Sequence, residues 1–219
     1  MSELILKSYI AGQWVLPKTS TETFDAINPA TEELAARLAM CGPDDVDVAV
    51  AAAKQAFASW GFTTLDHRIA LVEKLIAVFE RRYDEMVAAI SIEMGAPFDL
   101  SYNEQAECGP GHLRETIKAA RAMEWERRIG GTGKLVHEPI GVCVLITPWN
   151  WPINQLAAKI GPALIAGCTM VLKPSEISPL SAQLFAEFID EAGFPAGVSQ
   201  RPRLCGYRRP PHVRAARSG

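Results

Sequence analysis

The residue types that could act as nucleophiles or metal ligands are scattered along this chain of 219 residues. Its five cysteines form no C-x-x-C pair, so the sequence supports neither a zinc site nor a dithiol redox site. His67, His112 and His137 are isolated, with no metal-ligand spacing, and we interpret them as surface or structural residues. Cys143 and Cys168 stand in apolar surroundings and are interpreted as packing residues. The cysteines are Cys41, Cys108, Cys143, Cys168 and Cys205.

Polar side chains follow two apolar runs in the second half of the chain. Residues 142–146 read as a strand buried on both faces and lead into Asn150, whose neutral amide can donate to developing negative charge. Residues 169–173 read as a second buried strand, ending at Lys173 with Glu176 just beyond. Taken alone, Asn150 is better explained as a cap for the helix near Pro152, and the two charges as solvated groups at a strand end and near a helix start.

The elements between these runs determine whether the polar residues meet. A helix follows Pro152 and is expected to be interrupted at Gly161-Pro162, because proline removes a helix hydrogen bond. A second helix begins after Ser178-Pro179 and stops at Gly193. This strand–helix–strand–helix order predicts adjacent parallel strands in an α/β sheet, which binds ligands beyond the carboxyl ends of its strands.

The first half of the chain reads as short strands followed by helices. A hairpin turn is expected at Ala11-Gly12, and helices are expected from Pro43 to Phe57, from Leu65 onward, over 84–94 and over about 111–125. The segment Gly130-Gly131-Thr132-Gly133 could be a phosphate-binding loop, but it precedes a strand instead of following one. We therefore interpret it as a hairpin turn.

Several blocks of this chain, in order and spacing, resemble the aldehyde dehydrogenase superfamily. In that family a strand ends in Pro-Trp-Asn followed by an aromatic residue and proline, as in residues 141–152 here. The other matching blocks are Tyr9–Trp14, Asn28–Thr31, the alanine-rich helix to Phe57 and Trp60, Glu93–Pro97, Gly161–Leu164 with Gly167, Lys173–Glu176 and Glu191–Val198. The resemblance covers residues 7–198.

The resemblance implies an α/β fold, namely the N-terminal part of the aldehyde dehydrogenase fold: a helical layer plus an incomplete Rossmann-like parallel sheet, with the catalytic domain absent. Residues 1–198 would be the N-terminal part of the cofactor-binding domain, and residues 126–139 the start of an oligomerisation arm. The family oxidises an aldehyde to a carboxylic acid with NAD or NADP through a cysteine thiohemiacetal, and its intact members are homo-oligomers.

The resemblance also assigns roles to individual residues. Asn150 would stabilise the oxyanion and also contact the cofactor. Lys173 would donate to the hydroxyls of the adenosine ribose and Glu176 would accept from them. Because a carboxylate at Glu176 would repel a 2′-phosphate, NAD is favoured over NADP. The remaining cofactor-binding candidates are Ile146, Thr147, Pro148, Trp149, Pro174 and Ser175.

The family's nucleophilic cysteine, its general-base glutamate and its Gly-Ser-Thr turn lie downstream of the Lys-Pro-Ser-Glu block and are not found in this sequence. The family is more than twice this length. We therefore expect a family oxidoreductase whose chain is inactive alone. The alternative is a non-catalytic remnant, such as a pseudogene product or an assembly partner of intact subunits.

Residues 199–219 differ in composition from the rest of the chain, with six arginines and no Asp or Glu. We expect this segment to form a disordered tail outside any packed core. Our hypothesis is that a shifted reading frame in GC-rich DNA produced it. Nucleic-acid binding is disfavoured, because the segment lacks a folded scaffold and aromatics beyond Tyr207, and the remaining chain is acidic.

Composition places the chain among soluble globular proteins, with 48% hydrophobic and 21% charged residues. No apolar run reaches the roughly 18 residues of a membrane span, and the N-terminus reads as no secretory signal. Unpaired cysteines are typical of a reducing compartment, so we expect a cytoplasmic protein without a membrane partner.

Overall fold

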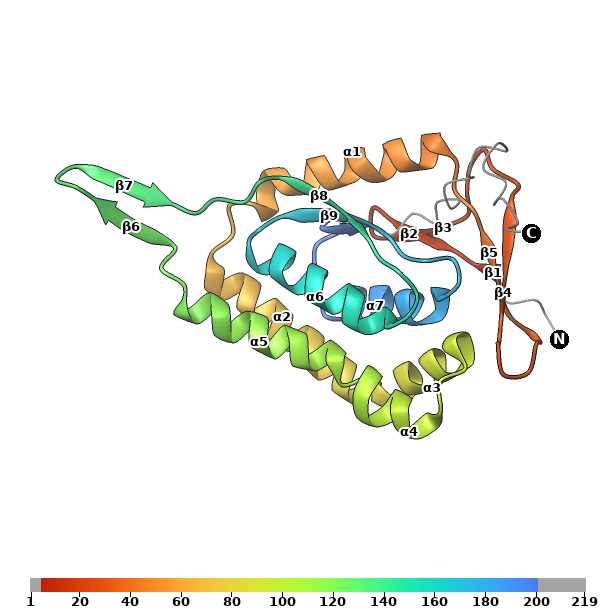
Figure 1. Cartoon of the computed structure of the whole chain (residues 1–219). Coiled ribbons are helices and arrows are strands. Elements are labelled where there is room, and N and C mark those ends of the chain that lie inside the picture. The colour runs from red at the N-terminus through yellow and green to blue at the C-terminus, as the bar shows by residue number, and fades with distance from the viewer. Residues whose placement is uncertain (1–4, 201–219) are drawn as a thin grey trace, which may run out of the picture.

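The computed structural model describes residues 5–200 of the chain (Figure 1). Its N-terminal strands form two small sheets. The β2–β3 hairpin turns at Ala11-Gly12 as predicted, whereas β5 was not anticipated from the sequence. In the second sheet β5 lies between β1 and β4. The strands are β1 (Ile5–Leu6), β2 (Ser8–Ile10), β3 (Gln13–Val15), β4 (Thr23–Ile27) and β5 (Leu34–Ala39).

A layer of helices follows these strands. Thr64 caps α2 by accepting a hydrogen bond from the backbone of His67, and Gly95 ends α3 in the left-handed conformation, at φ 66°. The helix starts expected at Pro43 and Leu65 are confirmed. The helices are α1 (Pro43–Trp60), α2 (Leu65–Arg81), α3 (Tyr83–Met94), α4 (Phe98–Leu100), a π-helical turn (Ser101–Gln105) and α5 (Cys108–Ala122).

The glycine-rich segment is a hairpin turn, as predicted. It connects β6 (Glu126–Ile129) with β7 (Gly133–Val136), and the two strands pair antiparallel. Every residue of both strands is exposed. The hairpin projects away from the rest of the chain (Figure 1).

The second half of the chain forms a parallel sheet in the order β10-β9-β8. Its elements are β8 (Val142–Ile146), α6 (Pro152–Ile165), β9 (Thr169–Lys173), α7 (Pro179–Glu191) and β10 (Ser199–Gln200). The expected parallel pairing of the two apolar strands is confirmed, with Val144 opposite Val171. Helix α1 packs against one face of the sheet through Ala49 and Ala53, while α6 and α7 cover the other face (Figure 1).

Burial on both faces was predicted for both strands, and for β8 this is wrong. Strand β9 is buried along four of its five residues, but Val144 is 65% exposed and Ile146 is 67% exposed. Among the described residues, β8 is an edge strand of the sheet, and α1 packs against its start at Val142. The exposed side chains therefore lie where helix coverage ends.

The expected interruption of α6 at Gly161-Pro162 is also wrong, because the helix continues through Pro162 to Ile165. A proline inside a helix costs about 3 kcal/mol, partly because it removes the hydrogen bond to the carbonyl four residues earlier. That carbonyl belongs to Ala158, which is exposed and can be solvated. Burial of Ile160 and Leu164 in the core offsets the remaining cost.

The predicted tail was expected to lie outside any packed core from Ser199 onward, and for its first two residues this is wrong. Ser199 and Gln200 form β10, which pairs with β9, and both side chains are buried. The side-chain carbonyl of Gln200 accepts a hydrogen bond of 2.6 Å from the backbone N–H of Ala11, which fixes the strand against β2. The rest of the predicted tail, residues 201–219, lies outside the described residues.

One hydrophobic core joins the helical layer to the parallel sheet. Phe79 of α2 meets Phe185 and Phe188 of α7 edge to face, with ring centroids 6.3 Å and 5.3 Å apart. Trp60, at the end of α1, is buried and donates a hydrogen bond of 3.1 Å to the carbonyl of Cys168, just before β9. This hydrogen bond fixes the start of β9 against the end of α1.

Candidate functional site

The carboxyl ends of β8 and β9 bring the two predicted site segments together. Ile146 is the register partner of Lys173, and the backbone N–H of Thr147 donates a hydrogen bond of 3.2 Å to the carbonyl of Lys173. The segment leading to Asn150 and the segment leading to Glu176 therefore begin side by side. Parallel strands of an α/β sheet place ligand-binding loops at this edge.

Lys173 and Glu176 form an ion pair at this edge, with 2.9 Å between the ammonium nitrogen and a carboxylate oxygen. Burial by itself raises the pKa of Glu176. The hydrogen bond from Lys173, a backbone hydrogen bond and the charge of Lys173 outweigh burial and hold that pKa below its usual value of 4.5. The carboxylate is therefore ionised at neutral pH and can accept hydrogen bonds.

The turn between these two charges has its own support. The hydroxyl of Ser175 accepts a hydrogen bond of 3.2 Å from the backbone N–H of Ile177, and Ser175 itself is buried. Pro174 is half-buried and fixes the backbone beside it. These two residues shape the turn that brings Glu176 back toward Lys173.

Asn150 lies in the bend between β8 and α6 and is exposed. The alternative role as a helix cap is not observed, because the N-cap position is Trp151 and no side chain caps α6. Within residues 5–200, no group accepts a hydrogen bond from the Asn150 amide. The amide can therefore donate to a group outside the fold.

The four residues that lead to Asn150 differ in exposure. Thr147 is buried, so ordinary packing explains its presence at the strand end. Ile146 is 67% exposed, Trp149 is 49% exposed, and Pro148 is exposed as well. Packing within the described chain does not explain these three side chains, and they offer an apolar surface to a ligand.

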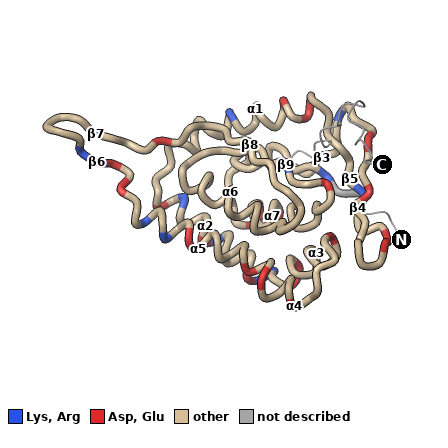
Figure 2. The backbone as a smooth tube through the Cα atoms, viewed as in Figure 1, with Lys and Arg blue, Asp and Glu red and all other residues tan. Residues whose placement is uncertain are grey.

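Charge is sparse around this edge of the sheet. Between residues 139 and 172 the sequence carries a single charged residue, Lys159, and Figure 2 shows that most charges lie on other elements. Lys173 and Glu176 are therefore the charges that the two strand-end segments themselves offer to a ligand.

None of the four described cysteines has the environment of an activated nucleophile. Cys41 and Cys168 are buried. Burial and the neighbouring Glu104 and Glu107 raise the pKa of Cys108, while burial and the neighbouring Cys168 raise the pKa of Cys143. The interpretation of Cys143 and Cys168 as packing residues agrees with these surroundings, and Cys205 lies outside the described residues.

The described residues also contain no group of three or more His, Cys, Asp or Glu side chains that could hold a metal ion. His112 contacts the side chain of Asn154, and His67 packs edge-on against Trp60, in keeping with structural roles. None of the helices in the described part of the chain has the length and apolar character that a bilayer span requires.

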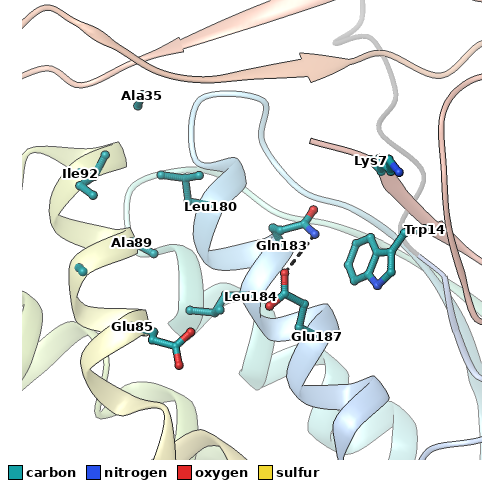
Figure 3. A pocket seen from close by; sticks show the side chains of 11 residues that line it. Lys7, Trp14, Ala35, Glu85, Ala89, Ile92, Leu180, Gln183, Leu184 and Glu187 are labelled. Atoms are coloured by element: carbon teal, nitrogen blue, oxygen red, sulfur yellow. Dashed lines mark hydrogen bonds between the residues drawn. The ribbon is translucent and has the colours of Figure 1, made fainter. Parts of the chain in front are cut away.

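A cavity of about 510 Å³ lies away from the strand ends, between α3, α7 and the N-terminal strands (Figure 3). Trp14, Leu180 and Glu187 are among its lining residues, and none of the predicted site residues lines it. The predicted site is thus an open sheet edge and not this cavity.

Sequence reasoning gave no functional role to Glu93, which the structure places at the start of α7. Its carboxylate is 1% exposed and accepts hydrogen bonds from the backbone N–H groups of Leu180, at 2.5 Å, and Ser181, at 3.2 Å. The hydroxyl of Ser181 donates to the same carboxylate. The partners are 87 and 88 residues away, so no local pattern could have revealed the contact.

Comparisons with known proteins agree with this arrangement. A sequence model described as "Aldehyde dehydrogenase family" matches residues 14–201. The 3-succinoylsemialdehyde-pyridine dehydrogenase of a Pseudomonas species is 50% identical over 191 residues, which cover 87% of this chain and 40% of that protein. This chain thus spans about 40% of the length of such relatives.

Solved structures show the same likeness. The aldehyde dehydrogenase of Bartonella henselae superposes with a TM-score of 0.89 at 44% identity, covering 93% of this chain and 43% of that one. Aldehyde dehydrogenase C of Pseudomonas syringae, a C291A mutant in complex with NAD+ and octanal, gives a TM-score of 0.88 at 43% identity. That match covers 92% of this chain and 41% of the other.

Proposed function

Because this chain belongs to the aldehyde dehydrogenase family, we propose that it carries the oxyanion donor and the ribose-binding pair of an NAD(P)-dependent enzyme that oxidises an aldehyde to a carboxylic acid. The observation that carries the proposal is the hydrogen bond between Thr147 and Lys173, which places both segments at one sheet edge. Asn150 follows β8 and Glu176 follows β9, so the two residues come after neighbouring strands.

Lys173 and Glu176 have the chemistry that a ribose requires. The ammonium donates hydrogen bonds and the carboxylate accepts them, so the pair matches two hydroxyls that both donate and accept. The two side chains are hydrogen-bonded to each other at 2.9 Å, and the hydroxyls of a bound ribose would bond to the same two groups. The nicotinamide cofactor, when bound, supplies the hydride acceptor for aldehyde oxidation.

The ionised carboxylate of Glu176 also favours NAD over NADP. It lies beside the position proposed for the ribose, where a 2′-phosphate would bring like charges together. At a separation near 4 Å in high dielectric, this repulsion amounts to about 1 kcal/mol, or roughly fivefold in affinity. The half-buried setting of Glu176 strengthens this preference.

Asn150 is proposed to act on the aldehyde oxygen. As a thiolate adds to the carbonyl carbon, that oxygen becomes negative, and the amide of Asn150 donates a hydrogen bond to it. Losing one such donor typically lowers the rate by roughly 10²–10³. The thiolate must come from a cysteine other than the four described ones, so we propose that the chain by itself does not turn over aldehydes.

The β6–β7 hairpin is proposed as a contact between subunits in a homo-oligomer. Ile129 is 51% exposed, Leu135 is 37% exposed and Val136 is 42% exposed, although apolar side chains gain by burial. This observation also favours a second candidate function, in which the chain is a non-catalytic assembly partner of intact subunits.

Titration of the purified chain with NAD and NADP, followed by calorimetry, tests the proposed cofactor site. We expect NAD to bind more tightly than NADP, and both Lys173→Ala and Glu176→Ala to weaken NAD binding at least fivefold. Lys54→Ala, which removes an exposed lysine from α1, serves as the control and should leave the affinity unchanged. No binding by the wild-type chain, or equal binding by all variants, would contradict the proposal.

A further inference from the structure

The first turn of α7 is capped by a side chain of another helix, α3. Its N-cap residue, Ser178, makes no side-chain cap hydrogen bond, and Pro179 has no backbone N–H to satisfy. The next two N–H groups, those of Leu180 and Ser181, both donate to the carboxylate of Glu93. Glu93 thereby takes the part that an Asp or Asn at the N-cap usually plays.

Glu93 and the helix end are matched in charge as well as in hydrogen bonding. A buried carboxylate is costly unless several donors satisfy it. The start of a helix supplies such donors together with partial positive charge. With the hydroxyl of Ser181 added, three donors converge on one carboxylate that is 1% exposed.

The position of Glu93 is itself fixed by the end of α3. Gly95 ends this helix at φ 66°, and a Cβ atom there would lie 2.8 Å from Cγ of Pro29. The turn that contains Pro29 is closed by a hydrogen bond from the backbone of Ala30 to the side chain of Asn28. The family-like blocks Asn28–Thr31 and Glu93–Pro97 therefore meet at the end of α3, although neither contains a proposed site residue.

Helix α7 starts immediately beyond the proposed nucleotide site. Only residues 174–178 separate Lys173 from the first residue of α7. The near end of this segment is fixed by the pairing of β9 with β8, and its far end by the capped first turn of α7. Figure 3 shows Ile92 of α3, the sequence neighbour of Glu93, and Leu180 of α7, whose backbone N–H bonds to Glu93, on helices that face each other.

We propose that Glu93 is a positioning residue for the nucleotide site: by capping α7 it holds residues 174–178 in the conformation that presents Glu176 beside Lys173. This inference rests on the proposed function, since it concerns the affinity of that site. It assigns a task to a residue that lies on another helix and does not contact the nucleotide.

The test combines two measurements on the full chain. Hydrogen exchange without any nucleotide measures the exchange rates of the backbone amides of residues 174–181. Calorimetric titration measures the affinity of the site for NAD. We expect Glu93→Ala to raise the exchange rates of the Leu180 and Ser181 amides at least tenfold and to weaken NAD binding about tenfold. Glu93→Gln retains an acceptor oxygen and should restore both values to within about threefold of the wild type.

Two further variants separate positioning from general destabilisation. Asp84→Ala removes the same charge from an exposed position of α3 and should change neither measurement. Ser181→Ala removes only the hydroxyl donor, so a folded variant with a partly weakened cap remains available if Glu93→Ala does not fold. It should raise amide exchange at Ser181 at least twofold and weaken NAD binding by a similar factor.

Unchanged exchange at Leu180 and Ser181 in folded Glu93→Ala would overturn the proposal. So would faster exchange combined with unaltered NAD affinity, because the cap would then not position the site. If Glu93→Ala does not fold, unchanged exchange and affinity in Ser181→Ala would have the same effect. A wild-type chain that binds no NAD overturns the proposed function. The comparison of amide exchange between the wild type and Glu93→Ala then decides whether Glu93 holds residues 174–178 in place.

Discussion

Two carboxylates in this chain, those of Glu176 and Glu93, each have a defined structural task. Lys173 and Glu176 are three residues apart and close a turn at the end of β9. Glu93 contacts a helix end that lies 87 residues later in the chain. Glu93 is buried and Glu176 is half-buried, so their hydrogen bonds are worth more than those of a fully exposed pair.

The ion pair of Glu176 predicts a specific dependence of stability on pH. Its pKa is held below the usual value of 4.5, so its contribution to stability is fully present above 4.5 and is lost as pH falls through the lowered value. The difference in free energy of unfolding between the wild type and Glu176→Gln should stay constant from pH 7 to 4.5 and shrink only below. Urea denaturation at a series of pH values measures it, and a difference that already shrinks above pH 5 would contradict the lowered pKa.

Asn150 offers a test that separates a chemical role from a structural one. Because its amide has no partner within residues 5–200, Asn150→Ala should change the free energy of unfolding by less than about 0.5 kcal/mol. A helix cap would lose about 1 kcal/mol on the same substitution. Denaturation curves of the wild type and of Asn150→Ala distinguish these values, and a loss of 1 kcal/mol or more would indicate that Asn150 caps the helix.

At the scale of single residues, the sequence predicted which segments meet at the strand ends but not how their side chains interact. The family-like motifs identified Asn150, Lys173 and Glu176, and the strand–helix–strand pattern placed them at one edge. The motifs did not show that Lys173 and Glu176 bond to each other. The role of Glu93 depends on how α3 packs against α7, which no local pattern encodes.

At the scale of elements, close packing of α2 against α5 depends on one glycine. A Cβ atom at Gly109 would lie 2.5 Å from the ring of Phe79, which is fully buried and cannot move aside. Two residues along the same helix, Gly111 faces open space, with no atom within 4 Å of such a Cβ. The two glycines therefore form a matched pair.

Substitution of these glycines by alanine should have opposite effects. Gly109→Ala is expected to destabilise the chain by about 1–3 kcal/mol through overpacking. Gly111→Ala should stabilise it by about 0.5–1 kcal/mol, because alanine favours the helix and meets nothing. Chemical denaturation of both variants checks the pair, and equal effects would show that the ring of Phe79 does not restrict this contact.

Elements with a clear periodicity of apolar residues or a clear stop signal were predictable. Elements whose formation depends on tertiary contacts were not. The apolar face of α2 and the glycine after α3 marked those helices well. Strand β5 was missed because its sequence, Leu34–Ala39, mixes alanine with one arginine and pairs only through β1 and β4. Pro162 suggested a helix break, but packing of α6 in the core outweighed it.

At the scale of the whole molecule, the hairpin stands apart from the hydrophobic core clusters. Its apolar side chains are exposed within one chain, and burial between subunits would remove that cost. We expect Ile129→Lys to shift the chain toward smaller species in analytical ultracentrifugation. Ala58→Lys on the exposed side of α1 is the control, and a wild-type chain that is already monomeric at high concentration would contradict the arm's role.

The chain as a whole is expected to show no aldehyde oxidation. The role proposed for Asn150 requires a nucleophile that has already formed an oxyanion, and none of the four described cysteines is activated. Incubation of the purified chain with NAD and several aliphatic and aromatic aldehydes, followed by NADH absorbance, tests this expectation. Turnover that survives purification and disappears on Asn150→Ala would show that one of the five cysteines acts as the nucleophile.

The contact between Trp60 and the carbonyl before β9 has an optical consequence. Trp60 is 1% exposed, so its fluorescence should lie at short wavelength and resist quenching by iodide. Trp149, at the sheet edge, is 49% exposed and should emit at longer wavelength and respond to soluble quenchers and to bound nucleotide. Of the five tryptophans in the chain, Trp60 thus reports on the integrity of the core and Trp149 on events at the strand ends.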